Sequence, residues 1–503
     1  MEAAGGDCVV SSYEDNSLSG IADLNVLDIP QDELNWSSIR LADIINRDTR
    51  LEASVYGIEG RHARETINNS KWAIKTLCGD NGLSTAYYPS RFKGVWVDKS
   101  TLPIYQPSQI TEIYPKPNSY ISEATKTDVN VLRVKKGQIL LTRSGTIGKC
   151  SIVTDTLYNK IFSDDLIRIT CLEEADVGYV YAFLKSKTGN TLINTNNYGA
   201  VISHIEPKHL SDIPIPDPPK MLKYRIHELI MKSFRLRDES NILLDRAEAL
   251  LIKELKLPPV NEFQLNNLDP SVEVNNFVVK FSELNKRLEA SFHAPIVKAI
   301  SSHLKDHALE ITSVGNAQIS KNIILPGRFK RVYVSEGQGV LFFGGKQLLE
   351  LSPTETKYLS TKQHTSRIDR ELRLKENMVL LTRSGTIGKT ALVPKHWENW
   401  IANEHIIRIL PASNSIAGYL YVFLSTEYGK ELIKRFTYGS VVDEIDDRHV
   451  SQIQVPLMQS SCMKQINDLA LKANELRYEA YALEQQALSV FNHEVLKTEL
   501  GIT

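Results

Sequence analysis

The feature that most constrains this chain is a perfect internal repeat of ten residues. Leu140 to Lys149 reads LLTRSGTIGK, and Leu380 to Lys389 reads the same letters 240 positions later (380 against 140). The same offset pairs Arg168 with Arg408 and continues without a gap toward the C-terminus. Because a repeat unit of about 200 residues is far longer than the units of solenoid proteins, we infer two copies of a whole domain.

Each copy is predicted to begin with a mixed domain. Short β-branched and aromatic runs such as Val95-Trp96-Val97 and Val332-Tyr333-Val334 lie between Gly, Pro and Asn residues, which is typical of strands joined by turns. Arg61 to Leu77 and Val177 to Asn194 show helical apolar spacing. The sequence therefore indicates the α+β class, with two duplicated domains that mix helices and strands.

The second part of each copy is predicted to be one long helix. Apolar or small residues recur at alternating steps of four and three, which is the heptad seam of a coiled coil. At 1.5 Å per residue, a helix of about 38 residues spans about 57 Å. The large residues of the two seams are Leu222, Ile226, Leu229, Leu236, Leu243, Leu250, Ile466, Leu469, Leu476, Leu483 and Val490.

The two seams place large and small residues at equivalent positions, so we predict an antiparallel coiled coil that separates the mixed domains in a pseudo-two-fold arrangement. The alternative, in which each helix packs only on its own domain, stays open, although the charged faces opposite the seams weigh against full burial. The predicted order is an N-terminal extension over 1–35, a mixed domain over 36–217, a helix over 218–257, a linker over 258–280, a second mixed domain over 281–458 and a second helix over 459–498.

Composition narrows the class of protein. With 503 residues, 42% of them apolar and 24% charged, the chain is typical of soluble globular proteins with several domains. We expect no export signal, because the start is polar and acidic, and no membrane segment, because no apolar run approaches about 18 residues. The five cysteines are scattered, which favours free thiols in a reducing compartment. The formal net charge of -1 means that any contact with nucleic acid must use local basic clusters or partner subunits.

Two motifs suggest catalysis, and both fail on inspection. Gly-Thr-Ile-Gly-Lys resembles a phosphate-binding loop, but Arg143 and Arg383 stand where that loop needs glycine, and the flanks read as a β-hairpin. Asp217-Pro218-Pro219-Lys220 resembles an amino-methyltransferase motif, but Lys220 replaces its aromatic ring and no glycine-rich loop is present to hold S-adenosylmethionine. We therefore predict no catalytic centre in this chain.

A group of three residues, His204, Glu206 and His209, suggests a metal site. In the second copy Glu444 stands in place of His204, so one copy lacks that ligand. We interpret His209 as a packing or hydrogen-bonding residue and predict no metal site.

Taken together, these features resemble the specificity subunits of type I restriction-modification systems, over about Leu51 to Leu496. The residues that carry the resemblance are the repeated LLTRSGTIGK, Asp165 to Ile169, Tyr198-Gly199, His209-Leu210 and Ile213-Pro214-Ile215-Pro216 before a long helix. The resemblance implies two target-recognition domains, over 36–217 and 281–458, that alternate with two spacer helices. It implies that these domains read the two halves of a bipartite site in double-stranded DNA.

The resemblance also implies partners and a setting. Two DNA adenine methyltransferase subunits would dock on the helices, and translocating restriction subunits would join them. S-adenosylmethionine, ATP and Mg would then belong to those partners, with no cofactor in this chain, and the assembly would act at the nucleoid in a prokaryotic cytoplasm as a phage defence. The alternatives are a targeting subunit of the same fold in another DNA modification or defence system, a catalytic nuclease or methyltransferase, and a scaffold that binds no DNA.

Candidate DNA contacts fall into two groups. Residues that both copies share are expected to build the scaffold or to grip phosphate, because phosphate contacts position a protein without specifying sequence. These are Arg91, Lys93, Arg143, Ser144, Thr146, Lys149, Tyr198, Arg328, Lys330, Arg383, Ser384, Thr386, Lys389 and Tyr438. Polar residues that differ between the copies are expected to read bases, since two half-sites should differ and Asn favours adenine where Lys favours guanine. These are Lys116, Asn118, Lys126, Asn194, Asn196, Asn197, Lys346, Gln347, Lys362, Gln363, Lys434 and Thr437.

Overall fold

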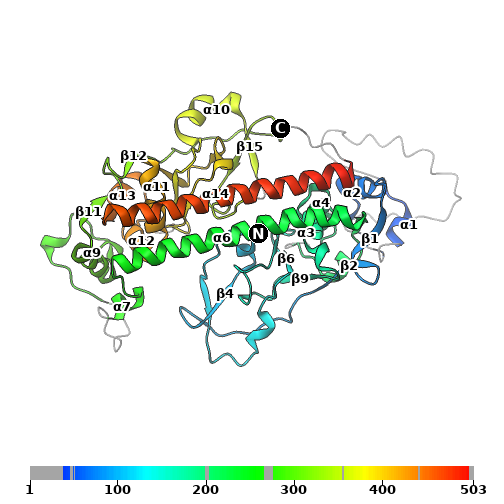
Figure 1. The fold of residues 1–503 in the computed structure, drawn as a ribbon, viewed down its shortest axis with the longest axis horizontal. Coiled ribbons are helices and arrows are strands. Elements are labelled where there is room, and N and C mark those ends of the chain that lie inside the picture. The colour runs from blue at the N-terminus through cyan, green and yellow to red at the C-terminus, as the bar shows by residue number, and fades with distance from the viewer. Residues whose placement is uncertain are drawn as a thin grey trace, which may run out of the picture.

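The computed structural model describes residues 38–45, 49, 51, 53–198, 203–265, 276–353, 356–439 and 442–497 (Figure 1). The predicted N-terminal extension over 1–35 and residues 266–275 of the predicted linker lie outside the described residues. Helices and strands occur in both halves of the chain, which confirms the mixed class. Within the described ranges, no helix is long and apolar enough to cross a membrane.

The first half is built on a six-stranded sheet with the strand order β10-β1-β2-β9-β6-β7, beside a small sheet with the order β3-β5-β4-β8. The strands are β1 (Ala73–Cys78), β2 (Gly82–Tyr87), β3 (Trp96–Val97), β4 (Leu102–Tyr105), β5 (Ser119–Ile121), β6 (Ile139–Thr142), β7 (Cys150–Ile152), β8 (Ile161–Phe162), β9 (Leu166–Cys171) and β10 (Pro214–Asp217). The helices are α1 (Leu41–Ile45), α2 (Ile58–Asn68), α3 (Val177–Lys185), α4 (Lys187–Thr195) and α5 (Pro207–Leu210). Short helical turns are η2 (Ala53–Tyr56), η3 (Pro107–Thr111), η4 (Val129–Leu132) and η5 (Glu174–Asp176).

The second half has three sheets, with the strand orders β12-β19-β16-β17, β13-β15-β14-β18 and β11-β20. The strands are β11 (Glu310–Ser313), β12 (Ser320–Ile324), β13 (Tyr333–Val334), β14 (Val340–Phe343), β15 (Lys357–Leu359), β16 (Val379–Thr382), β17 (Thr390–Leu392), β18 (Ile401–Ala402), β19 (Ile406–Pro411) and β20 (Gln454–Leu457). The helices are α8 (Ala290–His293), α9 (Pro295–His307), α10 (Thr361–Arg367), α11 (Asn414–Ser425), α12 (Glu427–Lys434) and α13 (Asp447–Ser451). Short turns are η6 (Phe281–Glu283), η7 (Ile368–Leu372) and η8 (Lys395–Trp397).

The strand pairing around the repeated decapeptide is the same in both halves. Leu141 pairs with Cys150 between the antiparallel strands β6 and β7, and Leu381 pairs with Thr390 between β16 and β17. Each decapeptide is therefore a β-hairpin, as its flanks predict. A phosphate-binding loop would instead lead from a strand into a helix.

A buried arginine fixes the loops of each half from the inside. Arg168 and Arg408 are almost completely buried, and both donate hydrogen bonds to backbone carbonyl oxygens. Arg168 donates to the oxygens of Val131 and Leu132, each at 2.9 Å, and Arg408 donates to that of Asn403 at 3.0 Å. Burial lowers the pKa of Arg408 to about 9. These hydrogen bonds offset the desolvation of a buried charge and hold the surface loops in place.

Two long helices run the length of the molecule, side by side (Figure 1). Helix α6 (Lys220–Glu254) has 35 residues, and the short helix α7 (Val260–Leu265) follows it. Helix α14 (Ser460–Val490) has 31 residues and continues into η9 (Phe491–Leu496), so both are shorter than about 38 residues. The prolines at 218 and 219 come just before α6, where a proline fixes the backbone without removing a helical hydrogen bond.

Contacts between the two helices run in opposite order along the chain. Arg225 pairs with Glu494 at 2.7 Å, and Ser233 donates to the carbonyl oxygen of Ala480 at 2.6 Å. The helices are therefore antiparallel. None of the predicted seam residues on either helix is exposed.

Each helix also packs on both halves of the protein. Leu244 and Leu251, near the end of α6, join the hydrophobic core of the second half. Ala487 and Val490, near the end of α14, join the core of the first half. The alternative in which each helix packs only on its own domain is therefore wrong.

Asp238 docks α6 on the first half through three hydrogen bonds. Its buried carboxylate accepts from Thr154 Oγ1 and from the backbone nitrogens of Asp155 and Thr156, each at 3.1 Å. We expect Asp238→Asn to lower the free energy of unfolding by about 1–3 kcal/mol, because an amide NH2 would face these donors and charge-assisted hydrogen bonds would be lost. Urea denaturation checks this value.

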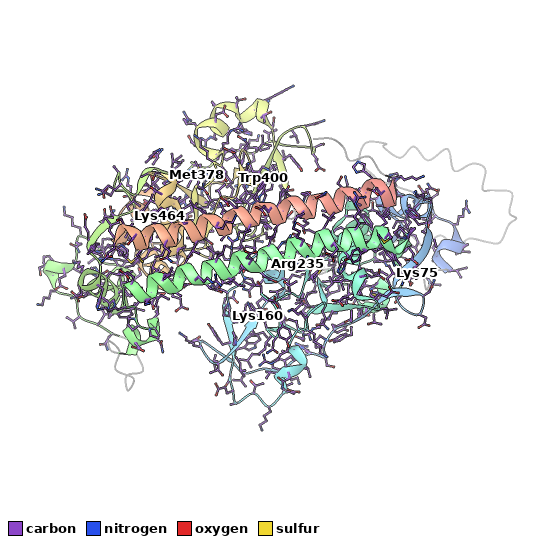
Figure 2. The ribbon with its side chains drawn as sticks, viewed as in Figure 1. Lys75, Lys160, Arg235, Met378, Trp400 and Lys464 are labelled. Atoms are coloured by element: carbon purple, nitrogen blue, oxygen red, sulfur yellow. The ribbon has the colours of Figure 1, made fainter. Side chains whose placement is uncertain are left out.

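The matched control for this prediction is Arg235→Ala on the same helix. Arg235 is labelled in Figure 2 and its side chain is exposed, with a long 3.7 Å pair to Glu228. We expect its loss to change stability by less than about 0.5 kcal/mol. Equal effects of the two variants would contradict the docking role of Asp238.

Candidate nucleic-acid interface

Each decapeptide hairpin ends in an exposed turn that we call the hairpin tip, Ser144 to Thr146 in the first half and Ser384 to Thr386 in the second. The glycines of both tips have positive φ, 69° at Gly145 and 72° at Gly385, which a side chain would strain. Below the first tip, the Thr142 hydroxyl donates to Thr146 O at 2.6 Å, and the second hairpin repeats this bond. Both hairpins therefore hold an exposed threonine and backbone in one fixed shape.

The arginine that precedes each tip is bound to protein carboxylates. Arg143 lies 3.5 Å from Asp165, and its guanidinium stacks 4.1 Å from the ring of Tyr88. Arg383 pairs with Glu444 at 2.5 Å. Both arginines are largely buried, so they act as scaffold in this structure.

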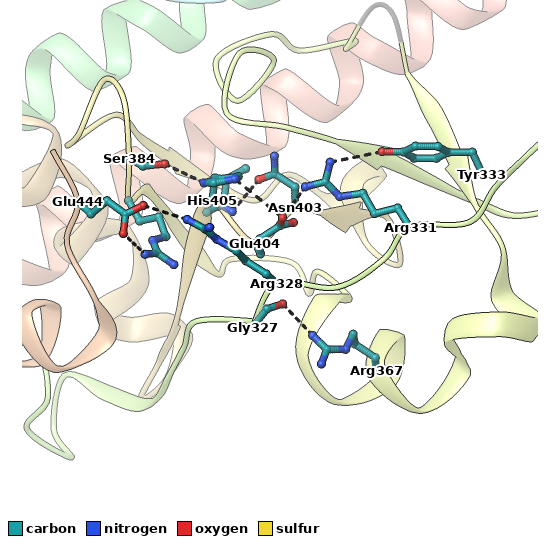
Figure 3. Close-up of polar contacts among 12 residues, drawn as sticks. Gly327, Arg328, Arg331, Tyr333, Arg367, Ser384, Asn403, Glu404, His405 and Glu444 are labelled. Atoms are coloured by element: carbon teal, nitrogen blue, oxygen red, sulfur yellow. Dashed lines mark hydrogen bonds and ion pairs between the residues drawn. The ribbon is translucent and has the colours of Figure 1, made fainter. Parts of the chain in front are cut away.

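Beside the tip, an acid and a histidine occupy swapped positions in the two halves. The first half has Asp165 and His204, whereas the equivalent positions of the second half hold His405 and Glu444. Ser144 donates to Asp165 in the first half. In the second half Ser384 Oγ makes a hydrogen bond of 2.8 Å with His405 Nδ1 (Figure 3). The negative charge beside the tip therefore comes from a different loop in each half.

A second exposed element, which we call the basic–aromatic strand, is the segment Arg91 to Val97 in the first half and Arg328 to Val334 in the second, and these segments end in the short strands β3 and β13. It carries Arg91, Lys93 and Trp96 in one copy and Arg328, Lys330 and Tyr333 in the other, all exposed. The rings of Trp96 and Tyr333 are 57% and 40% exposed. Arg328 also lies 3.6 Å from Glu444, which connects this strand to the hairpin tip (Figure 3).

Equivalent acids hold the basic–aromatic strand in place. The backbone nitrogen of Phe92 donates to Asp164 at 3.1 Å in the first half, and Arg331 pairs with Glu404 at 2.5 Å in the second. Trp96 and Tyr333 are not among the site residues predicted from the sequence. The signal was present, because both aromatic residues follow a shared Arg-Phe-Lys at equivalent positions.

Lys149 and Lys389 point to the opposite half of the protein. Lys149 Nζ lies 2.8 Å from Glu350, and Lys389 Nζ lies 3.8 Å from Glu112. The backbones of Glu112 and Glu350 pair with each other as an antiparallel β-bridge. We call these four residues the clasp. Of the two roles expected for the shared residues, scaffold or phosphate grip, this geometry favours the scaffold for both lysines, because protein carboxylates already take up their charge.

Among the three asparagines at the end of α4, the structure contradicts a base contact for Asn196 only. Asn196 is only 4% exposed and donates to the carbonyl oxygen of His209 at 2.8 Å. Asn194 donates to Asn190, and Asn197 donates to Asn194 O at 2.6 Å. Asn196 therefore closes the end of α4 and is buried away from any base.

One tyrosine in each half, Tyr198 or Tyr438, packs on a histidine. The Tyr198 ring lies 5.2 Å from His209, and its hydroxyl donates to Glu206 at 2.7 Å, which lowers the pKa of that carboxyl. Tyr438 packs on His449 at 5.3 Å. His209 Nδ1 accepts from the backbone nitrogen of Glu206. Among the described residues, no group of three or more His, Cys, Asp or Glu is placed to hold a metal ion.

The remaining base-reading candidates do not gather at one surface. Lys116 pairs with Glu248 at 3.7 Å, and Lys434 pairs with Glu431 at 3.0 Å. Gln347 and Thr437 are half-buried and bonded to nearby backbone. The exposed candidates are Lys116, Asn118, Lys126, Lys346, Lys362, Gln363 and Lys434. Lys116, Asn118 and Lys434 line a cavity between the halves, whereas Lys362 and Gln363 lie on α10.

Comparison with known proteins gives one family match. Residues 351–468 match the family model of the type I restriction modification DNA specificity domain. No curated protein matches this chain. The matched range includes the second hairpin tip and Glu444, together with the start of α14.

Three solved structures are similar at low TM-score. The S subunit of the type I restriction-modification system from M. genitalium is 15% identical over 86% of this chain and 96% of its own, with a TM-score of 0.31. The HsdS subunit from Thermoanaerobacter tengcongensis is 12% identical over 84% and 99%, with a TM-score of 0.26. A chain from a study of assembly and conformational transition of the type I R-M system is 12% identical over 82% and 97%, with a TM-score of 0.25.

Proposed function

We propose that the chain is the DNA specificity subunit of a type I restriction-modification complex, because residues 351–468 match the family model of the type I restriction modification DNA specificity domain. Each half acts as a target-recognition domain that reads one part of a bipartite site. The chain performs no catalysis, and its helices dock two methyltransferase subunits, which restriction subunits join. S-adenosylmethionine, ATP and Mg belong to those partners.

The observation that carries the proposal is the repetition of one exposed surface on both halves. Each half presents a hairpin tip and a basic–aromatic strand built from equivalent residues. The antiparallel helices relate the halves in opposite orientation, which suits a protein that reads two half-sites at a fixed separation. The helix pair then sets the length of DNA that remains unread between the half-sites.

The charge distribution fits this surface. The net charge is -1, yet Arg91, Lys93, Arg328 and Lys330 lie exposed on the two basic–aromatic strands. Phosphate contacts of this kind give affinity that falls steeply with salt. Trp96 and Tyr333 add aromatic rings beside the charges, and such rings contact sugars or enter between base steps.

The decisive experiment maps methylated sites in cells that carry this chain with its methyltransferase partner. We expect a bipartite motif with a fixed spacer. Exchanging residues 36–216 for another recognition domain should change one half of the motif only. A change in both halves of the motif would contradict modular reading. Absence of methylated sites in cells that carry the unaltered chain would favour a scaffold role.

The basic–aromatic strand provides a residue-level prediction. We expect Trp96→Ala to weaken duplex binding by about tenfold, because a central exposed aromatic ring is removed from the contact. Tyr333→Ala should have a similar effect through the other half-site. Fluorescence anisotropy, with either half-site scrambled in turn, checks which half each ring contacts.

The control for these variants is Lys464→Ala on α14. Lys464 is exposed on α14, where it pairs with Asp468 at 2.5 Å (Figure 2). Its loss should leave duplex affinity unchanged. Unchanged binding by Trp96→Ala and Tyr333→Ala together would remove the basic–aromatic strand from the interface.

A further inference from the structure

A cavity of about 410 Å³ lies between the two halves of the protein. Its walls come from the first half at Tyr114, from the second half at Trp397 and Tyr421, and from the two long helices at Leu244 of α6 and Arg477 of α14. A volume of this size is within the usual range for small-molecule sites. Apolar and charged residues share the walls, and the acids among them, Glu112, Glu248 and Glu350, are each paired with a lysine.

The equivalent place in the first half is already filled by a side chain. There, Glu484 from α14 pairs with Arg237 from α6 at 3.1 Å and accepts a 2.5 Å hydrogen bond from Tyr181. The space left beside these three residues is only about 40 Å³. The first half therefore uses an arginine and a tyrosine to hold a carboxylate of the protein itself.

The second half keeps the arginine and the tyrosine but has no carboxylate. Arg477 and Tyr421 are the counterparts of Arg237 and Tyr181, whereas Leu244 stands where the first half has Glu484. The substitution of leucine for glutamate leaves the two polar side chains on the wall of an open cavity.

Arg477 and Tyr421 both have hydrogen-bond donors that find no acceptor among the described residues. Arg477 is only 7% exposed, and its hydrogen bonds go to the neutral Ser240 at 3.4 Å and Asn241 at 3.3 Å. Its Nη1 makes no hydrogen bond to any residue in the described ranges, and neither does the Tyr421 hydroxyl. A buried guanidinium favours a carboxylate partner, because its fork of N–H groups matches two carboxylate oxygens.

A further cation lies on the cavity wall. Lys430 lines it, where the first half has Asn190, and forms no ion pair with any residue that the structure describes. Burial lowers the pKa of Lys430, and the nearby charge of Lys116 acts in the same direction, whereas Glu248 and Glu427 act against it. An anion bound beside Lys430 would favour its charged form.

We propose that this cavity binds a small organic carboxylate with an apolar body. Its carboxylate takes the place that Glu484 fills in the first half, between Arg477 and Tyr421, and its body packs against Leu244 and Trp397. The inference does not depend on DNA binding. Because Tyr114 of the first half forms part of the wall, an occupied site connects the two halves.

The test uses the purified full-length chain and two probes of the same shape, benzoate and the neutral benzamide. We expect benzoate to raise the melting temperature and to give a saturable isotherm by calorimetry, and benzamide to bind at least about tenfold more weakly. Phenylacetate and hexanoate extend the panel to other apolar bodies. Failure of all three acids to bind would overturn the proposal.

Two variants locate the site. Tyr421→Phe removes only a hydroxyl and should weaken benzoate about tenfold. Leu244→Glu recreates the residue of the first half and should abolish benzoate binding because the protein's own carboxylate then occupies the place. Unchanged benzoate binding in Tyr421→Phe would refute the site, and this variant keeps the test valid if Leu244→Glu fails to fold.

Discussion

Replacement of Glu484 by leucine, the residue that the first long helix has at the equivalent position, should lower the free energy of unfolding by about 3–5 kcal/mol. Glu484 is 1% exposed and lies where the two helices meet the first half. Its carboxylate pairs with Arg237 and accepts from Tyr181. The leucine would leave a buried guanidinium and a buried hydroxyl without their acceptor, which is the main source of the loss.

The pH dependence of this effect follows from the pKa of Glu484. Burial alone would raise it, but the charge of Arg237 and the hydrogen bonds from Tyr181 and Arg237 hold it below its ordinary value. A lowered pKa in the folded state means that the ion pair stabilises the protein above the unfolded carboxyl's pKa of about 4.3. The difference between wild type and Glu484→Leu should therefore be full at pH 7 and shrink as the pH falls below that value.

Urea denaturation of both proteins at pH 7 and in acid measures this difference. The matched control is Glu475→Leu on the same helix, where the exposed carboxylate pairs with Lys472 at 3.0 Å. That pair is solvated, so its loss should change stability by less than about 1 kcal/mol. Adding Arg237→Leu to Glu484→Leu should recover part of the loss, because the unpaired guanidinium is removed. No recovery would mean that the loss comes from packing alone.

The helix pair shows what sequence periodicity can predict. Steps of four and three place Ile226 and Ile466 on one face, and the structure buries both in the contact between the helices or the cores beside it. The same helices bury a second face with polar residues such as Asp238 and Asn474. Periodicity cannot indicate that face, because its polar side chains are covered by loops that are far away in the sequence. Asn474, for example, donates to the carbonyl oxygen of Val393 at 2.9 Å.

The candidate site was harder to predict than the fold. Identity between the two copies predicted a shared hairpin, which the structure contains, but identity alone does not distinguish a phosphate grip from a contact within the protein. Lys149 illustrates this, since its partner Glu350 lies 201 positions away. The prediction that Asn196 reads a base was wrong for a related reason. A polar residue after a helix can bond nearby backbone, as Asn196 does with the carbonyl oxygen of His209.

The clasp provides the second large effect. We expect Glu350→Gln to lower the free energy of unfolding by about 2–3 kcal/mol. Glu350 is 3% exposed, and its carboxylate accepts from Lys149 Nζ at 2.8 Å and from the Thr111 hydroxyl at 3.0 Å. A glutamine keeps the shape but removes the charge that holds the half-buried Lys149 ammonium between the two halves.

Glu112→Gln is the matched control on the other side of the clasp. Glu112 faces Lys389 at the longer distance of 3.8 Å, and burial raises the pKa of its carboxyl despite that lysine. For an acid, a raised pKa in the folded state means that ionisation above it disfavours folding. We therefore expect Glu112→Gln to leave stability at pH 7 unchanged or slightly higher, in contrast to Glu350→Gln.

A double-mutant cycle separates the clasp from a phosphate contact. If Lys149 serves the clasp, Lys149→Ala and Glu350→Gln should each lose similar stability, and the double variant should lose little more than either one. The salt dependence of duplex binding should then stay the same in Lys149→Ala. A phosphate contact would instead reduce the slope of log affinity against log salt by about one and leave stability unaffected. Small-angle scattering of Glu350→Gln adds a third readout, because the two halves lose one of the contacts that fix their relative position.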